Sequence, residues 1–175
     1  GLVELAGALS QRSASDPERA FELGARGDLD RYLGTQYEFV QSHDDGSMEW
    51  RLQQFSYLND LVVRFCNLAG KTRLRPTPIP IGREFPPPGD FETAGRFADQ
   101  AASMVGALLW LTRCSRPDIA YAVGYPAKHV SDWSLASDKA LEQLIAYLQC
   151  TADSALHCWG APGDRLIPAC LSDAT

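Results

Sequence analysis

No apolar run in this sequence is long enough to cross a membrane. The longest, at residues 104–111, falls well short of the roughly 20 apolar residues that a spanning helix needs, so a membrane protein is not expected. The chain opens on Gly1-Leu2-Val3-Glu4, which has neither the basic start nor the apolar core of a signal peptide. It also lacks an initiator methionine, which suggests a cut N-terminus. We expect an intracellular protein, cytoplasmic or nuclear, with no membrane partner.

Basic residues are scarce as well. Lysine and arginine together number 16 against 22 aspartates and glutamates, which gives a formal net charge of −6. A free-standing nucleic-acid binder normally carries a basic face that neutralises phosphates, so this balance counts against that class. With 175 residues, of which 45% are hydrophobic and 22% charged, the composition is that of one globular domain or two small ones.

The five cysteines form no C-x-x-C pair. Their odd number, in a chain without a secretory signal, predicts reduced thiols rather than disulfides. A zinc site could be assembled on paper from Cys150, His157, Cys158 and Cys170. Because their spacing fits no common zinc module, small buried cysteines are the simpler interpretation.

A β-hairpin is the clearest pattern in the first half. Apolar and polar residues alternate strictly over 48–53, which is the period of a half-buried strand. Residues 32–41 are the expected partner strand. Between the two, residues 43–47 read His-Asp-Asp-Gly-Ser, and the Asp-Gly step supplies the positive φ angle that a tight connection requires.

One helix is expected on each side of this hairpin. Asp16-Pro17-Glu18 combines a cap, a proline at the first helical position and a first-turn acid, which predicts a short helix through Leu23. After the hairpin, residues 54–68 switch to helical period. The apolar stripe of that second helix is Phe55, Leu58, Val62 and Phe65. Residues 76–90 then hold six of the eleven prolines, so an extended linker should follow.

The second half begins with two predicted helices. Residues 103–112 are apolar nearly all round, which is typical of a buried helix. The next helix should start at Ser115, with Ser115 as its cap and the Asp118 carboxylate at the positive end of the helix dipole. Pro126 should kink or end it. In this interpretation Asp118 is structural rather than catalytic.

A third helix and two strands complete the second half. The helix should run from residue 135 to 149, and its apolar face comprises Leu141, Leu144, Ile145 and Leu148. Residues 155–159 and 165–172 then read as two strands around a turn at 160–164.

Two blocks of the second half, residues 105–112 and 115–123, resemble copia-type LTR retrotransposon polyproteins. Residues 105–112 are similar to the family pattern V-G-x-L-x-Y-L, and residues 115–123 to T-R-P-D-I-x-Y-A-V. The similarity continues through Lys139-Ala140-Leu141, Tyr147-Leu148 and Thr151. It ends at Leu171-Ser172-Asp173-Ala174, where the family has G-Y-S-D-A-D-W.

Further blocks lie upstream in the order that the family has. Tyr32-Leu33-Gly34 resembles its F-L-G-I strand. Gln54, Tyr57 and Phe65 fall where it has an S-Q-x-x-Y helix, and Pro76-Thr77-Pro78 resembles its S-T-P-L segment. The match therefore covers about residues 21–175, from the late reverse transcriptase to the opening strand of the RNase H.

The resemblance implies an α+β fold in which the hairpin closes the polymerase palm. The helices after it would form a thumb-like and connection-like bundle that holds the primer–template duplex, and the chain would end in a truncated RNase H-like first hairpin. The expected parts are residues 1–75, the palm end with the first thumb-like helix; 76–100, the proline-rich linker; 101–152, the helical thumb or connection; and 153–175, the start of the RNase H.

The catalytic groups that the resemblance implies are incomplete. Asp173 would be the first metal-binding carboxylate of the RNase H, whose chemistry uses several carboxylates to hold two Mg²⁺ ions. One aspartate cannot hold both ions, so Mg²⁺ belongs to the parent enzyme and no cofactor is expected for this chain alone. The family's polymerase turn, Y-V-D-D, would fall at or before Gly1. Asp44-Asp45 is not a substitute, because it precedes Gly46 in the hairpin turn.

The last helix departs from the family, which reads K-A-L-K-R-I-L-R-Y-L-K-G-T. Its apolar positions are kept, but four basic positions have become Glu142, Gln143, Ala146 and Gln149. Residues 142, 146 and 149 share one helix face. Basic residues there would either meet phosphates or only solvate the helix, and the sequence leaves both interpretations open.

Two functions are compatible with these patterns. The remaining cations near the motif blocks are Arg113, Arg116, Lys128 and Lys139, and they predict weak contact with an RNA–DNA hybrid or primer–template. The leading hypothesis is a fragment of a reverse transcriptase–RNase H polyprotein that is inactive alone and works with the rest of the polyprotein. The alternative, which the net acidity favours, is a repurposed non-enzymatic module whose helices bind another protein.

Overall fold

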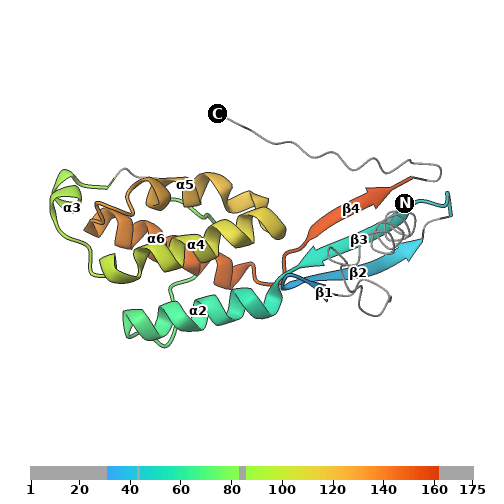
Figure 1. Cartoon of the computed structure of the whole chain (residues 1–175), viewed down its shortest axis with the longest axis horizontal. Helices are drawn as coiled ribbons and strands as arrows, with labels where there is room; N and C mark the ends of the chain where they lie inside the picture. Colours follow the sequence, from blue (N-terminus) through green and yellow to red (C-terminus); the bar gives the residue numbers. More distant parts are fainter. Residues whose placement is uncertain (1–30, 43, 83–85, 162–175) are drawn as a thin grey trace, which may run out of the picture.

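The computed structural model describes residues 31–42, 44–82 and 86–161. The predicted helix at 16–23, the predicted strand at 165–172 and Asp173 lie outside these residues. The elements in chain order are β1 (Arg31–Tyr32), β2 (Thr35–Ser42), β3 (Met48–Gln53), α2 (Phe55–Ala69), α3 (Pro88–Glu92), α4 (Ala98–Cys114), the 3-10 turn η2 (Pro117–Ile119), α5 (Ala120–Lys128), α6 (Leu135–Cys150) and β4 (Leu156–Gly160). The fold is α+β, as predicted, with the sheet at one end and the helices at the other (Figure 1).

The predicted hairpin is present as β2 and β3. The two strands pair antiparallel, with Phe39 opposite Trp50 and an irregularity between residues 39 and 41. Gly46 has a φ of 79°, which is the left-handed conformation that the Asp-Gly step predicted. The Ser47 amide donates to Asp45 Oδ1 at 2.8 Å, which closes the turn. Asp44 and Asp45 therefore belong to the hairpin turn.

The sheet has four strands, in the order β1-β2-β3-β4. The predicted strand at 155–159 exists as β4, but it pairs with β3, where Trp50 lies opposite Cys158 and Leu52 opposite Leu156. The sequence had placed this segment in a separate terminal hairpin. The second strand of that predicted hairpin lies outside the described residues. The pairing of β4 with β3 makes the helical region an insertion between two neighbouring strands, visible in Figure 1 as the orange-red β4 beside the cyan β3.

The two faces of this sheet differ in character because opposed residues point to the same side. One face carries the apolar rows Tyr37, Leu52, Leu156 and Phe39, Trp50, Cys158. The rings of Phe39 and Trp50 meet edge to face at 5.2 Å, and both remain partly exposed, at 46% and 39%. The other face is mainly polar, with Glu38, Arg51 and His157 in one row, although the exposed Trp159 lies opposite Glu49 in the next.

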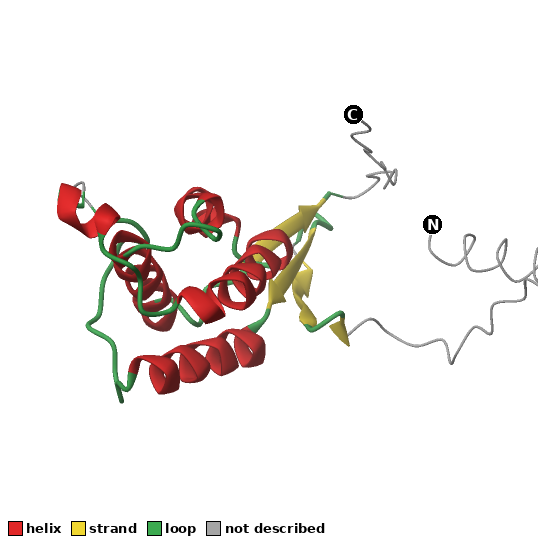
Figure 2. Ribbon diagram, turned by 60° about the vertical axis from the view of Figure 1, so that its left-hand side comes forward, coloured by secondary structure: helices red, strands yellow, loops and turns green. Residues whose placement is uncertain are grey.

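The hydrophobic core lies among α2, α4, α5 and α6, and Figure 2 shows these helices gathered beside the sheet. Helix α6 matches its prediction closely, since all four residues of its predicted apolar face are fully buried. Helix α2 also forms as predicted, and Leu58, Val62 and Phe65 are buried. Phe55 is an exception: the sequence placed it in the buried stripe, but as the first helical residue it is 47% exposed, outside the core.

The region after α4 differs from the prediction. Helix α4 is longer than expected and is not buried all round, since Leu109 is 42% exposed. The next helix does not start at Ser115: residues 117–119 form the 3-10 turn η2 and α5 begins at Ala120. Pro126 lies inside α5, which continues to Lys128. Pro126 is fully buried, so apolar burial offsets the lost backbone hydrogen bond.

The proline-rich segment 76–82 forms neither helix nor strand and bends at residues 78–81, and it is attached to the helices rather than free. The Gln143 amide donates to the Ile79 carbonyl at 3.3 Å. Beyond it, α3 presents the buried Asp90 to Lys139 at 2.6 Å. The interval 76–100, predicted as a linker, thus contains α3 and the first turn of α4.

Among the helices that the structure describes, none combines the length and the apolar character that a membrane-spanning segment needs.

Candidate nucleic-acid interface

The motif residue Arg116 is the centre of a polar cluster. Its side chain is 3% exposed, and its guanidinium binds Asp118 through two parallel contacts, Nε to Oδ1 at 3.0 Å and Nη2 to Oδ2 at 2.9 Å. It also donates to the Thr151 carbonyl at 2.8 Å and to the Thr151 hydroxyl at 2.7 Å. The guanidinium lies 5.5 Å from the centre of the Tyr147 ring. Every nitrogen of this side chain is therefore engaged within the protein.

Asp118 is the acceptor that completes the cluster. Its Oδ2 accepts a hydrogen bond from the Tyr147 hydroxyl at 2.8 Å in addition to the contacts with Arg116. Burial raises the pKa of Asp118, but the hydrogen bonds from Arg116 and Tyr147 outweigh it, so the pKa lies below its ordinary value. Burial and the adjacent carboxylate raise the pKa of Tyr147, which keeps its hydroxyl protonated as a donor.

These contacts correct the predicted helix start. No side-chain cap bonds the first turn of η2 or α5, and the Asp118 carboxylate instead joins the segment before α5 to the end of α6. Ser115 is not a cap either: its hydroxyl donates to Gln54 Oε1 at 3.0 Å, across to the start of α2. Asp118 remains structural, as predicted, but through an ion pair rather than a cap. Nothing in this ion pair of a buried arginine and a partly exposed aspartate resembles a nucleophile or a metal site.

The four predicted nucleic-acid contacts occupy different environments. Arg113 and Lys128 are exposed, and neither has a partner among the residues that the structure describes. Lys139 is also exposed, but it pairs with Asp90. Arg116 is buried and saturated with internal partners, so it is a poor candidate for a phosphate contact. The structure leaves Arg113 and Lys128 as the accessible pair.

The face of α6 where the copia-type family pattern has basic residues is not a uniform surface. Glu142 forms an ion pair with Lys71, in the loop that follows α2. Ala146 is only 4% exposed and belongs to the hydrophobic core, whereas Gln149 is partly exposed. The sequence placed 142, 146 and 149 on one accessible stripe. The structure corrects this at Ala146, which is covered by neighbouring helices.

Two features of this region were missed from the sequence. The first is the contact between Lys71 and Glu142, for which the alternation of charges gives no signal because 71 residues separate the partners. The second is Asp138, a buried carboxylate that accepts from the Arg96 amide at 2.6 Å, the Phe97 amide at 3.2 Å and the Trp133 indole at 2.6 Å. In the sequence it reads only as a first-turn acid of α6. Its role is to fix the loop before α4.

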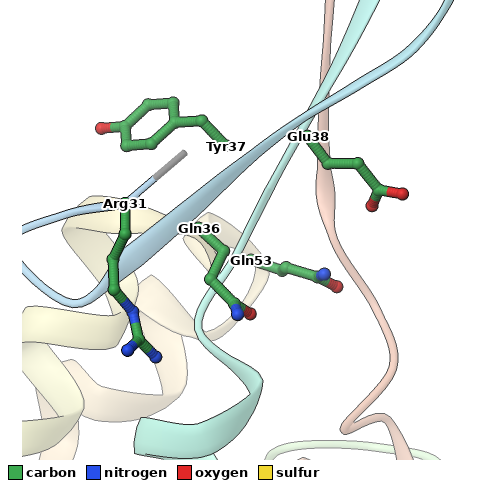
Figure 3. A pocket seen from close by; sticks show the side chains of 5 residues that line it. All are labelled: Arg31, Gln36, Tyr37, Glu38 and Gln53. Carbon is green, nitrogen blue, oxygen red and sulfur yellow. The ribbon is translucent and has the colours of Figure 1, made fainter. Parts of the chain in front are cut away.

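A shallow hollow of about 420 Å³ lies on the sheet. It is lined by Arg31, Gln36, Tyr37, Glu38 and Gln53. Figure 3 shows Gln36 between Arg31 and Gln53, as expected for residues opposed across three strands, while Tyr37 projects in another direction. Glu38 reaches Arg51 at 3.5 Å. The hollow offers polar side chains but no set of groups that could carry out a reaction.

The hypothetical zinc ligands are not assembled. The imidazole of His157 lies 2.5 Å from the Glu49 carboxylate on the polar sheet face, while Cys150 and Cys158 are free, exposed thiols. Within residues 31–42, 44–82 and 86–161, no group of three His, Cys, Asp or Glu side chains could hold a metal ion. Asp173 and Cys170 lie outside these residues.

Comparison with known proteins shows a distant similarity. The chain is 28% identical over 146 residues to an uncharacterized mitochondrial protein of Arabidopsis thaliana, AtMg00810. The alignment covers 78% of this chain and 52% of that protein, so the chain spans about half the length of its relative. No family model matches the sequence, and no solved structure matches it either.

Proposed function

We propose that this chain derives from a copia-type retrotransposon polyprotein and corresponds to the end of the reverse transcriptase and the start of the RNase H. Its role would be to help hold a nucleic-acid duplex as part of a longer polypeptide, within the cell. Catalysis would belong to other parts of that polypeptide, including the Mg²⁺ ions of its active centres. The similarity to a plant protein whose own function is uncharacterized is consistent with the proposed ancestry.

The observation that carries the proposal is that residues of separate motif blocks contact one another. Arg116 and Asp118 come from the block that resembles T-R-P-D-I-x-Y-A-V, and they meet Tyr147 and Thr151 from the block that resembles R-Y-L-K-G-T. Such contacts give a physical reason for these residue types to occur together at these spacings. A resemblance produced by chance would have no reason to place its quoted residues in one cluster.

A second contact of the same kind involves the upstream block. Gln54, at the position of the family's S-Q-x-x-Y helix, accepts a hydrogen bond from Ser115, immediately before the R-P-D-I residues. Three blocks that are far apart in the sequence are thus tied together by side-chain hydrogen bonds. This supports a common fold as the basis of the resemblance, with the motif residues acting in folding and not in catalysis.

The absence of independent chemistry can be tested directly. Purified full chain with Mg²⁺ or Mn²⁺ should neither extend a primer on an RNA template nor cleave the RNA of an RNA–DNA hybrid, because neither carboxylate set is complete. An Asp173→Asn variant is the control for cleavage. Activity that this substitution abolished would show a working RNase H centre and overturn the proposal that the chain is inactive alone.

Duplex binding is the second test. We expect affinity for an RNA–DNA hybrid no better than the ordinary non-specific range, roughly 10⁻⁴–10⁻⁶ M at physiological salt, because the chain carries a net charge of −6. A hybrid titration by fluorescence anisotropy measures this. Flanking genomic sequence gives independent support if an in-frame Y-x-D-D motif lies upstream and further RNase H carboxylates lie downstream.

A second candidate function is that of a protein-interaction module. The net acidity favours it, and so do the exposed apolar side chains on two core helices, Val63 at 58% and Leu109 at 42%. The hybrid titration separates the two functions. If the chain does not bind the hybrid even at low salt, while Val63→Asp or Leu109→Asp abolishes binding to a cellular protein, the interaction module is the better description.

A further inference from the structure

We propose that the main phosphate contact of this chain is the loop after α2, through Arg73 and Arg75, and that Glu142 restrains this contact by pairing with Lys71. The inference rests on the proposed function, because it names the surface that would meet the duplex. It differs from the sequence expectation, which placed the weak contacts at Arg113, Arg116, Lys128 and Lys139.

The loop is held in a defined position at both ends. Gly70 ends α2 in the left-handed conformation, with φ at 67°, and its amide donates to the Asn67 carbonyl at 3.3 Å. The Lys71 amide donates to the Cys66 carbonyl at 2.9 Å, which completes the helix end. Three residues later, Leu74 is 2% exposed and packs in the hydrophobic core. A buried leucine therefore anchors a loop that begins at a fixed turn.

Burial of Leu74 determines where its neighbours point. Arg73 and Arg75 flank it on both sides, and both are exposed. Neither has an ion pair or hydrogen bond among the residues that the structure describes. Their guanidinium groups are therefore accessible, in contrast to Arg116, and the planar fork of arginine matches the oxygens of a phosphate.

More cations gather at the same place. Arg96 is exposed, and its guanidinium reaches the Ala69 carbonyl at 3.4 Å, at the last residue of α2. We call Lys71, Arg73, Arg75 and Arg96 the α2-end cluster. Among the residues that the structure describes, the acidic partner of this cluster is Glu142, which pairs with Lys71; the two side chains are 37% and 43% exposed. A chain with a net charge of −6 thus carries a local concentration of positive charge.

The surroundings favour nucleic acid over an acidic protein. The exposed large apolar side chains of the described residues include Val63 and Ile81, but none lies within 64–80. Protein interfaces draw most of their affinity from buried apolar and aromatic anchors, which this loop lacks. A phosphate backbone requires no such anchor, because release of its counterions supplies the affinity.

Glu142 explains why the contact would be weak. It stands where the related family has a lysine, and it neutralises the nearest cation of the loop. The partially exposed pair adds little stability, so its removal should not disturb the fold. Replacing Glu142 with glutamine would release Lys71 and raise the local positive charge.

The test measures binding of the full chain to a fluorescent RNA–DNA hybrid at several salt concentrations. The double variant Arg73→Gln/Arg75→Gln is compared with Arg113→Gln/Lys128→Gln, which removes the same charge from another exposed surface. Each lost phosphate contact lowers the salt slope by about 0.9, so the loop variant should lose about two from the slope. This corresponds to about tenfold less salt-driven loss of affinity between 50 and 200 mM. Glu142→Gln should bind more tightly and with a steeper slope.

The outcomes separate this inference from the proposed function. If both double variants weaken binding equally, only net charge matters and the loop is not the contact, although duplex binding stands. If the wild-type chain fails to bind the hybrid at low salt, the proposed function itself fails. A parallel titration with polyglutamate represents an acidic protein partner. If the loop variant loses binding to polyglutamate but not to the hybrid, the cluster serves an acidic protein and the inference is overturned. Circular dichroism of each variant checks that the fold is retained.

Discussion

Replacing Asp118 with alanine separates two physical roles for this residue. A helix cap contributes about 0.5–2 kcal/mol, which is the effect that the sequence predicted. The structure instead shows Asp118 in a bidentate ion pair with Arg116, whose side chain is only 3% exposed. Without Asp118, that buried guanidinium keeps its two bonds to Thr151 but has no counter-charge.

An unpaired buried charge sets the size of the effect. Removing one partner of a buried ion pair typically costs roughly 3–5 kcal/mol, because the remaining ion stays desolvated. The Asp118 side chain is itself 40% exposed, so water can reach the vacated position and partly solvate the guanidinium. We therefore expect the free energy of unfolding to fall by about 3 kcal/mol, at the lower end of that range.

A double-mutant cycle tests the mechanism as well as the magnitude. Urea unfolding of the full chain, followed by circular dichroism and tryptophan fluorescence, gives the free energy for the wild type, Asp118→Ala, Arg116→Met and the double variant. The double variant should be less destabilised than the sum of the two single variants, since neither charge then remains unpaired. Asp153→Ala, at an exposed acid near Thr151, is the control and should change stability by less than about 0.5 kcal/mol.

Two results would refute this reasoning. A loss below about 1 kcal/mol for Asp118→Ala would agree with a simple cap. Additive effects in the cycle would show that Arg116 and Asp118 do not act as a pair. In either case the contacts between the motif blocks would contribute little to the fold, and the observation that supports the proposed function would be weakened.

Three other measurements concern the titration of Asp118, the tight packing around Gly95 and the burial of Ala146 in α6. Because the pKa of Asp118 is lowered in the folded chain, its contribution to stability is present above the ordinary aspartate pKa and is lost as pH falls through the folded pKa, and Asp118→Asn should remove this part of the acid dependence. Gly95→Ala should destabilise the chain by about 1–3 kcal/mol in urea unfolding, since the added Cβ would stand 2.6 Å from the Ser134 carbonyl oxygen. Ala146→Arg should destabilise the chain by at least a similar amount, because Ala146 is buried. Gln149→Lys, at a partly exposed position, should cost less than about 0.5 kcal/mol. Equal effects of these two substitutions would contradict the burial of Ala146.

The elements with strong local signals could be predicted from the sequence. The hairpin follows from strict alternation over 48–53 and from the Asp-Gly turn, both of which act within a few residues. Helix α6 could be predicted from apolar residues that recur with the 3.6-residue period of a helix, and the burial of those residues confirms the prediction. Periodicity was less reliable at helix ends, as Phe55 shows, because the first turn of a helix can extend beyond the core that the rest of it covers.

The tertiary partners could not be predicted. Asp118 has the same local sequence whether it caps a helix or pairs with Arg116, and only the position of Tyr147 and Thr151 decides between the two. Burial of Ala146 likewise depends on which helices pack against α6. The accessibility of a cation cannot be predicted from the sequence either: Arg116 and Arg73 look alike there, and only the contacts of the folded chain show that Arg116 is buried and Arg73 is exposed.

The pairing of β3 with β4 has a consequence for the order in which this chain can fold during synthesis. Glu49 and His157 meet across the two strands although 108 residues separate them. The hairpin and helices α2 to α6 emerge from the ribosome before β4, so their contacts can form before β4 has been made. Until residue 160 has been translated, β3 keeps an open hydrogen-bonding edge beside exposed Phe39 and Trp50. Chains terminated just before β4 should therefore be the ones most prone to associate through that edge.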